Sequence, residues 1–199
     1  MPHPKETPIR SLHPTQLTVG MAEVKEKKDH LARLGPSERK TFLESHAIPA
    51  VMGPGGKLFI TDHHHLGLAA LQAGVEAGYV EVEADLSKLA GDTFWQEMDE
   101  RAWVHPLDQY GVRHRYDRIP QRLEGLVDDV YRSLAGFVRA NGGYEKTPSP
   151  FAEFEWADFF RRLIPVEEVQ ADLDAAVKVA VGLARSERAK RMPGYTGKG

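Results

Sequence analysis

The sequence of 199 residues contains no cysteine. Disulfides, thiolate metal sites and cysteine nucleophiles are therefore excluded. Residues 1–7 lack the apolar core of a signal peptide. The most apolar later run, residues 175–184, is interrupted by Lys178 and is too short to span a bilayer. These absences predict a soluble cytoplasmic protein with no membrane partner.

The chain also lacks a strong charge of either sign. It has 26 lysines and arginines against 29 acidic residues, a formal net charge of −3. This balance argues against a protein dominated by contacts with a phosphate backbone, so nucleic acid is a conceivable partner but not the favoured one. The length of 199 residues is enough for one large domain or two small ones, and the hydrophobic fraction of 41% can supply a core.

One stretch stands out by its chemistry. The apolar run Leu58 to Ile60 leads into Thr61 and Asp62, then into His63, His64 and His65, and an alanine- and leucine-rich segment ending at Gly74 follows. The pattern predicts a strand, a tight polar turn and a helix. A helix N-terminus has unpaired N–H groups and partial positive charge, which favour an anion. We therefore predict a phosphate or nucleotide site at residues 62–65. The alternative, that these residues only cap the helix, is open.

The N-terminal part predicts mixed strands and helices. Residues 1–8, with three prolines, are expected to be a mobile end, and residues 9–12 a short strand. Residues 21–34 have helical spacing of apolar positions. A glycine- and proline-rich turn at 53–56 predicts a hairpin of residues 48–52 with 58–61.

Beyond the predicted helix, residues 79–84 alternate valine with glutamate and predict a half-buried strand. Residues 9–115 are thus expected to form an α+β domain. Residues 116–188 are expected to be a helical extension, in which Pro120 begins a long helix and residues 151–164 form an aromatic helix of the core. The basic, glycine-rich residues 189–199 are expected to be a flexible tail.

Phosphoryl transfer is one chemistry that the turn could support, because it needs anion donors, a divalent metal and a base. His64 and His65 are candidates for phosphate contact, and Asp62 is a candidate for magnesium or proton handling. Glu23 and Lys27, four residues apart on the first helix, could face the same pocket. The alternative for that pair is a surface ion pair.

Two other classes of function, metal-assisted hydrolysis and DNA binding, need features beyond the turn. Metal-assisted hydrolysis would need ligands from elsewhere, such as His105 or His114, because adjacent histidines do not share a helix face. A DNA-binding module would need a helix-turn-helix signature, and the helical half shows no convincing one.

Three segments resemble the ParB/sulfiredoxin-like superfamily and, more narrowly, its ParB-like nuclease group. They are Leu12 to Leu17, Ile48 to Val51 and Leu58 to His65. The similarity covers roughly residues 9–115 and extends to Tyr131–Ala135 and Pro150–Phe154. It implies an α+β fold with a small mixed sheet and helices, followed by an all-helical C-terminal extension.

The activities that the resemblance implies differ. Sulfiredoxins require a cysteine that is absent here, and ParB partition proteins require a helix-turn-helix. Free-serine kinases of the superfamily carry Asp-Gly-His-x-Arg in the turn and a catalytic glutamate. Asp62 and His64 match this motif, but His63 replaces glycine, Leu66 replaces arginine, and Gln16 stands where the catalytic glutamate is usual.

We therefore expect a protein that binds ATP or ADP with Mg2+ and acts on a small hydroxylated substrate, with phosphotransferase activity favoured over nuclease activity. A non-catalytic nucleotide- or DNA-binding protein is the third alternative. The sequence gives no oligomeric state. The expected catalytic residues are Asp62, His64 and Glu23; the expected ligand-binding residues are His63, His64, His65, Lys27 and Gln16; and the expected metal ligand is Asp62.

Overall fold

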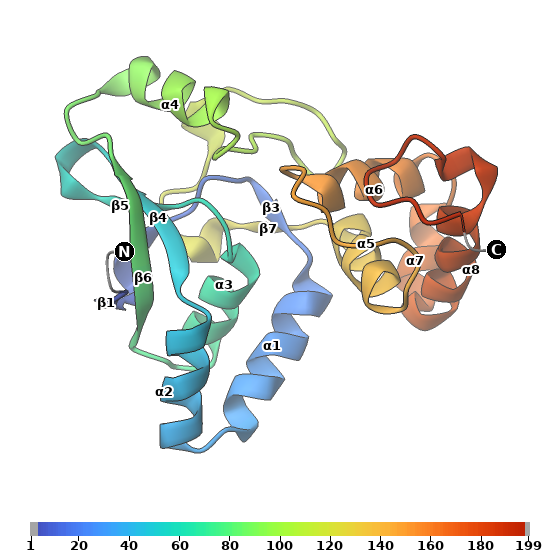
Figure 1. Ribbon diagram of the computed structural model, residues 1–199, viewed down its shortest axis with the longest axis horizontal. Coiled ribbons are helices and arrows are strands. Elements are labelled where there is room, and N and C mark those ends of the chain that lie inside the picture. Colours follow the sequence, from blue (N-terminus) through green and yellow to red (C-terminus); the bar gives the residue numbers. More distant parts are fainter. Residues whose placement is uncertain (1–3, 198–199) are drawn as a thin grey trace. The chain divides into compact units, whose positions relative to one another are not determined.

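The computed structural model describes residues 4–197 and divides into two compact units (Figure 1). Unit 1 contains the residues up to Val19 together with Val24–Val127, and unit 2 contains Gly20–Glu23 together with the residues from Asp128 onward. Strands and helices are interspersed along unit 1, whereas unit 2 is mainly helical. The chain is therefore an α+β protein, as the sequence predicts.

The sheet of unit 1 has the strand order β1-β6-β4-β5-β2. The strands β4 and β5 form the expected antiparallel hairpin, and Gly55 and Gly56 adopt the positive φ that its turn requires. β6 pairs in parallel with β4 and antiparallel with β1, and β2 pairs in parallel with β5, so the sheet is mixed. The strand bounds are β1 Lys5–Pro8, β2 Leu12–His13, β4 Ile48–Met52, β5 Leu58–Ile60 and β6 Ala77–Asp85; β3 (Thr18–Val19) and β7 (Val127–Asp128) form a separate two-stranded sheet.

The helices of unit 1 differ in how deeply they are buried. α3 (His64–Gln72) carries alanine and leucine on all sides, and seven of its residues are buried.

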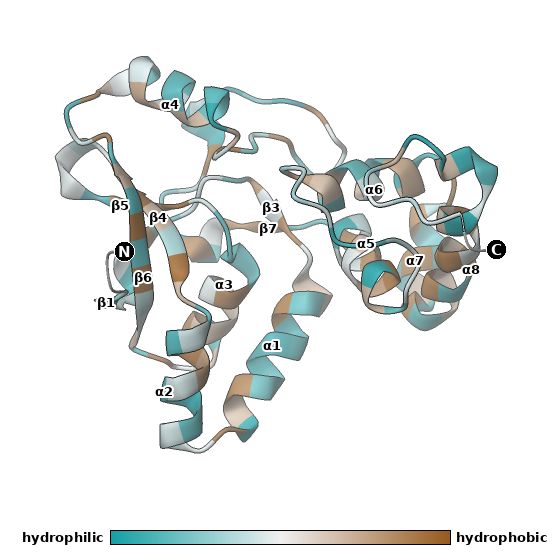
Figure 2. Ribbon diagram, viewed as in Figure 1, coloured by the Kyte–Doolittle hydropathy of each residue, from teal (hydrophilic) through white to brown (hydrophobic). Residues whose placement is uncertain are grey.

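Along β6, hydrophobic and hydrophilic residues alternate, as expected for a half-buried strand (Figure 2). A second apolar cluster joins α4 (Gly91–Glu100) to the sheet through Phe94, Met98 and Phe59. The remaining helices are α1 (Met21–Arg33), which begins in unit 2, and α2 (Pro36–Ser45).

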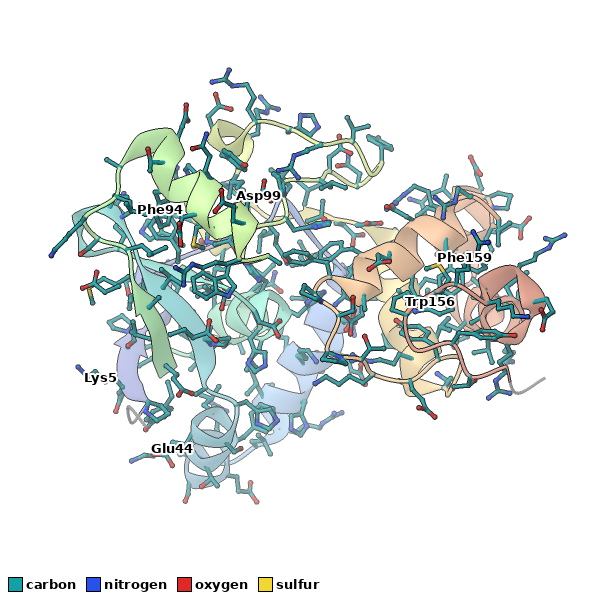
Figure 3. All side chains as sticks on the ribbon, turned by 45° about the horizontal axis from the view of Figure 1, so that its top comes forward. Lys5, Glu44, Phe94, Asp99, Trp156 and Phe159 are labelled. Atoms are coloured by element: carbon teal, nitrogen blue, oxygen red, sulfur yellow. The ribbon has the colours of Figure 1, made fainter. Side chains whose placement is uncertain are left out.

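Unit 2 is built around the aromatic helix that the sequence assigns to the core. α6 (Ala152–Arg161) buries Trp156 completely, and Tyr144 stacks on it with ring centroids 4.3 Å apart. Trp156 and Phe159 extend from α6 in Figure 3. The other helices are α5 (Val130–Ala140), α7 (Val166–Ala171) and α8 (Leu173–Arg185). Across residues 4–197, no helix is both long and apolar enough to cross a bilayer.

Both ends of the described chain are more ordered than the sequence suggests. Residues 5–8, expected to be mobile, form β1 because they find a partner strand in β6. Near the other end, Ala189 is fully buried, and the Trp156 indole donates to the carbonyl of Pro193 at 2.8 Å. The expected flexible tail therefore packs into unit 2 at least to Tyr195. Residues 198–199 of that tail lie outside the described residues.

The segment after residue 115 also differs from expectation. Pro120 does not begin a helix: residues 116–128 form two 3₁₀ turns and β7, and α5 begins only at Val130. Asp129 caps α5, and its carboxylate accepts from the amide of Tyr131 at 3.0 Å. Residues 116–127, assigned from the sequence to the helical extension, lie in unit 1, where Ile119 packs with Phe94.

Candidate functional site

The turn between β5 and α3 is built as a strained helix start. His63 is the N-cap residue of α3 and adopts a left-handed conformation with φ 60°. Its amide donates to Oδ1 of Asp62 at 2.6 Å, which holds the acidic side chain against the turn. A side chain is strained in this left-handed conformation, which glycine adopts without cost. His63 retains the glycine conformation and adds an imidazole.

The three histidines have different environments. His64 and His65 are buried, whereas His63 is half-buried and Asp62 is exposed. Nδ1 of His63 is nevertheless shielded from solvent and makes no hydrogen bond within the described structure. The side chain of His63 does not cap the first turn of α3. Asp62 and His63 are thus the members of the predicted site that solvent reaches.

His64 connects the turn to the segment after β2. The amide of Thr15 donates to Nε2 of His64 at 3.0 Å, and the Thr15 hydroxyl donates to the carbonyl of Ile60 at 2.7 Å. Because an amide can only donate, Nε2 must be the unprotonated nitrogen of a neutral ring. His64 is 3% exposed, so it positions the turn in this arrangement. Its predicted contact with phosphate stays a prediction.

Gln16 lies on the same buried segment. It forms a parallel β-bridge with His105, and the amide of His105 donates to the carbonyl of Thr15 at 2.9 Å. Thr15, 1% exposed, thereby joins the turn, the N-terminal segment and the chain near residue 105. The sequence alone does not predict this role of Thr15, although the residue lies in the His-Pro-Thr-Gln segment of the ParB-like resemblance.

The carboxylate of Glu83, which the sequence did not mark as a candidate, lies beside the turn. The hydroxyl of Thr61 donates to Oε2 of Glu83, on β6, at 2.8 Å. The acidic residues of β6 alternate with valine, and this side of the strand faces away from the core. The alternation predicted the strand correctly, but only the sheet register shows that Glu83 lies next to Thr61.

Glu23 forms an ion pair with a residue of α5. Its carboxylate pairs with Nη1 of Arg132 on α5 at 2.8 Å, and the two side chains are only 13% and 11% exposed. The guanidinium of Arg132 lies over the ring of Phe154 at 5.3 Å, a cation–π contact. A Cβ at Gly136 would overlap the Glu23 carboxylate, so glycine permits this approach. Glu23 and Arg132 belong to unit 2.

Lys27 is half-buried on α1 and belongs to unit 1, as do Asp62 and Gln16. The expected joint action of Glu23 and Lys27 with the turn stays a prediction. No cluster of three or more histidine, aspartate or glutamate side chains suited to a metal ion occurs within residues 4–197. A magnesium ion held by Asp62 would therefore take most of its ligands from phosphate oxygens and water, which is its usual preference.

His13, at the end of β2, is electrostatically unusual. Burial lowers the pKa of its imidazole below the ordinary value, and the positive charge of Lys57 lowers the pKa further. The ring packs against Phe59 with centroids 5.2 Å apart. The neutral form is therefore favoured at pH 7.

Comparisons with known proteins agree with this architecture. A family model described as "Putative ParB-like nuclease" matches residues 5–162. The chain belongs to this ParB-like family. The match covers the sheet, the turn and the helices α5 and α6, so the family model includes unit 1 and about half of unit 2, without α7 and α8. The superfamily resemblance and the α+β fold are thereby confirmed.

A solved structure is similar over almost the whole chain. The crystal structure of protein Atu1540 from Agrobacterium tumefaciens shares 38% sequence identity, with 98% of each chain covered and a TM-score of 0.91. No curated protein matches. The fold of this chain is therefore shared with that protein over 98% of each chain.

Proposed function

We propose that the turn Asp62 to His65 binds the phosphate group of a nucleotide or of another phosphorylated small molecule. The observation that carries this proposal is His63, a left-handed N-cap residue whose Nδ1 is buried without a partner at the start of α3. Strained backbone conformations persist where the surrounding structure demands them, and they cluster at functional sites. The positive end of the helix favours an anion at the same place.

The finer form of the proposal is ATP- or ADP-dependent transfer of a phosphoryl group to a small hydroxylated substrate. Asp62 is exposed beside the helix start and would bind Mg2+ together with phosphate oxygens. Gln16 has no basic group, since its side chain is an amide. Glu83, held by Thr61, would therefore be the base that accepts the proton of the substrate hydroxyl.

Calorimetric titration with ATP, ADP and CTP, with and without magnesium, tests the binding step. We expect saturable binding by the wild type, at least tenfold weaker binding by His63→Ala, and loss of the magnesium dependence in Asp62→Asn. Asp174→Asn, which alters an exposed carboxylate in the first turn of α8, is the matched control. Wild-type protein that binds none of the three nucleotides would overturn the nucleotide form of the proposal.

Phosphate transfer is tested separately with free serine and other small alcohols as acceptors. Product formation by the wild type, with a loss of about 10²–10⁴-fold in Glu83→Gln, would match the removal of a general base. If the protein binds nucleotide but transfers phosphate to none of the acceptors, the kinase proposal is rejected and the protein is a nucleotide-binding protein.

The family description gives a second candidate, a nuclease. Its chemistry is metal-assisted hydrolysis of a phosphodiester, which uses the same phosphate contacts and the same Asp62 carboxylate. Nicking of supercoiled plasmid DNA in Mg2+ or Mn2+, lost in Asp62→Ala, would support it. Nicking that is unchanged in Asp62→Ala would reject a nuclease centre at this turn.

A further inference from the structure

A second feature of unit 1 is a pocket beside the N-terminal end of α4. Its volume is about 340 Å³, within the range of small-molecule sites. Two aromatic side chains and four polar ones line it, so it offers both stacking and hydrogen bonding. The lining residues are Gly91, Asp92, Trp95, Gln96, Arg115, Tyr116 and Asp117.

The aromatic walls are held in place before any ligand arrives. The rings of Trp95 and Tyr116 are nearly parallel, at 15° with centroids 5.9 Å apart. Trp95 packs edge-to-face on Phe59 at 5.5 Å, and the Tyr116 hydroxyl donates to Oδ2 of Asp99 at 2.6 Å. Asp99 and Phe94 extend from α4 in Figure 3. Rigid aromatic surfaces lose little conformational entropy when a flat ligand stacks on them.

Two of the polar side chains, Asp92 and Arg115, offer a planar acceptor and a planar donor. Asp92 forms no ion pair within the described part of the chain, so its carboxylate is available as an acceptor. Arg115 approaches Asp117 at 3.5 Å, but its side chain is 84% exposed, which leaves its guanidinium able to turn toward a ligand. Exposed ion pairs of this kind contribute little to stability and are readily exchanged.

We propose that this pocket binds the guanine base of a nucleoside. Guanine presents two adjacent N–H donors, at N1 and N2, that a carboxylate accepts together, and two adjacent acceptors, O6 and N7, that a guanidinium contacts. Asp92 and Arg115 supply that pair of partners beside an aromatic platform. Adenine and cytosine lack the adjacent N–H donors. The inference is independent of the phosphate site, because guanosine has no phosphate.

Titration of the protein with guanosine, inosine, adenosine and cytidine by calorimetry tests this specificity. Guanosine should bind saturably, and inosine, which lacks the N2 amino group, should bind about tenfold more weakly. In ¹⁵N-labelled protein, guanosine should shift the indole N–H resonance of Trp95 and leave that of Trp156, in unit 2, unchanged. Equal affinities for all four nucleosides, or no saturable binding of guanosine, would overturn the proposal.

Variants of the pocket distinguish specific recognition of guanine from unspecific stacking on its aromatic rings. Asp92→Asn should weaken guanosine binding at least tenfold and reduce the preference over inosine. Glu100→Gln alters an exposed carboxylate at the other end of α4 and should bind as the wild type does. Unchanged binding by Asp92→Asn would reject the assigned recognition. A single-stranded tetranucleotide with one guanine should have the same affinity as guanosine if the natural ligand is a free nucleoside. It should bind more tightly than guanosine if the natural ligand is a nucleic acid.

Discussion

The amide of Thr15 donates to Nε2 of His64 across 49 positions of the chain, at 3.0 Å and fully shielded from water. The same threonine bonds the end of β5 through its hydroxyl, so the turn between β5 and α3 is held by a residue of the N-terminal segment. The bond fixes the tautomer of His64 and the place where α3 begins. His64 is thus a positioning residue for Asp62 and His63 in the present arrangement.

Replacing His64 by alanine should destabilise the protein. The substitution leaves the Thr15 amide buried and unpaired, which costs about 1–3 kcal/mol, and it also creates a cavity. His64→Gln, whose side-chain oxygen can accept the same bond, should recover part of the loss. Urea unfolding of the three proteins measures the difference. Equal stability of the alanine and glutamine variants would show that the hydrogen bond does not contribute.

His63→Gly should have opposite effects on stability and binding. Glycine relieves the left-handed strain, which costs about 1–2 kcal/mol. It also has more entropy in the unfolded chain, which offsets about 0.5–1 kcal/mol, so the expected net gain in unfolding free energy is about 0–1.5 kcal/mol. The imidazole is lost, so phosphate-dependent binding should weaken. His63→Ala removes the ring and keeps the strain, and therefore should weaken binding with no gain in unfolding free energy. A glycine variant less stable than the alanine variant would contradict the strain argument.

The ion pair of Glu23 with Arg132 should be strongly coupled. Removing one partner from a buried pair leaves an uncompensated charge, so Glu23→Gln should lower the free energy of unfolding by about 3 kcal/mol. Arg132→Met should have a similar effect, and the double variant should lose less than the sum of both. Denaturant unfolding of the four proteins completes the cycle. Additive losses would show that the two side chains do not interact.

Gly136→Ala tests the same contact from the backbone side. An added Cβ would overlap the Glu23 carboxylate, so the ion pair or α5 would have to shift. We expect a loss of about 1–3 kcal/mol, typical of overpacking. The matched control is Gly182→Ala on α8, where a Cβ meets no atom within 4 Å. That control should be neutral or slightly stabilising, because alanine favours a helix.

Acid should weaken the loop around residue 108. Desolvation raises the pKa of the Asp108 carboxyl, but hydrogen bonds from His114, Val112 and Tyr110 outweigh it and hold the pKa below its ordinary value. A carboxyl with a lowered pKa contributes stability above its ordinary pKa, and that contribution is lost as the pH falls through the lowered value. The carboxyl resonance of Asp108 in an NMR titration should report this midpoint.

Asp108→Asn provides the control for the acid effect. The amide oxygen still accepts from the backbone of Tyr110 and Val112, but it does not titrate. The variant should therefore show a shallower loss of unfolding free energy below pH 4 than the wild type. Parallel curves for the two proteins would exclude Asp108 as the titrating group.

Local patterns were enough to predict several elements. The glycine- and proline-rich turn predicted the β4–β5 hairpin, and the alternation of valine with glutamate predicted β6. The apolar run before Asp62 predicted the strand, turn and helix of the candidate site. These features depend on neighbours within a few residues, so backbone propensity and hydrophobic period suffice.

Features that depend on a distant partner were not predictable in the same way. The prolines of residues 1–8 suggested a mobile end, yet β6 provides an edge on which residues 5–8 pair. Pro120 suggested a helix start, yet residues 116–127 pack into unit 1. A single sequence contains no signal for which strand edge or which core accepts such a segment.

By itself, the sequence determined the α+β class, the ParB-like resemblance and the position of the strand–turn–helix with its acid and histidines. Only the tertiary structure decided that the amide of Thr15 donates to Nε2 of His64 and that the hydroxyl of Thr61 donates to Glu83. The ion pair of Glu23 with Arg132 likewise depends on the fold. The physical reason is the separation along the chain between the residues that interact. Secondary structure follows from local backbone preferences and periodicity, whereas the ionic and hydrogen-bond partners of a side chain are set by where the folded chain brings distant residues together.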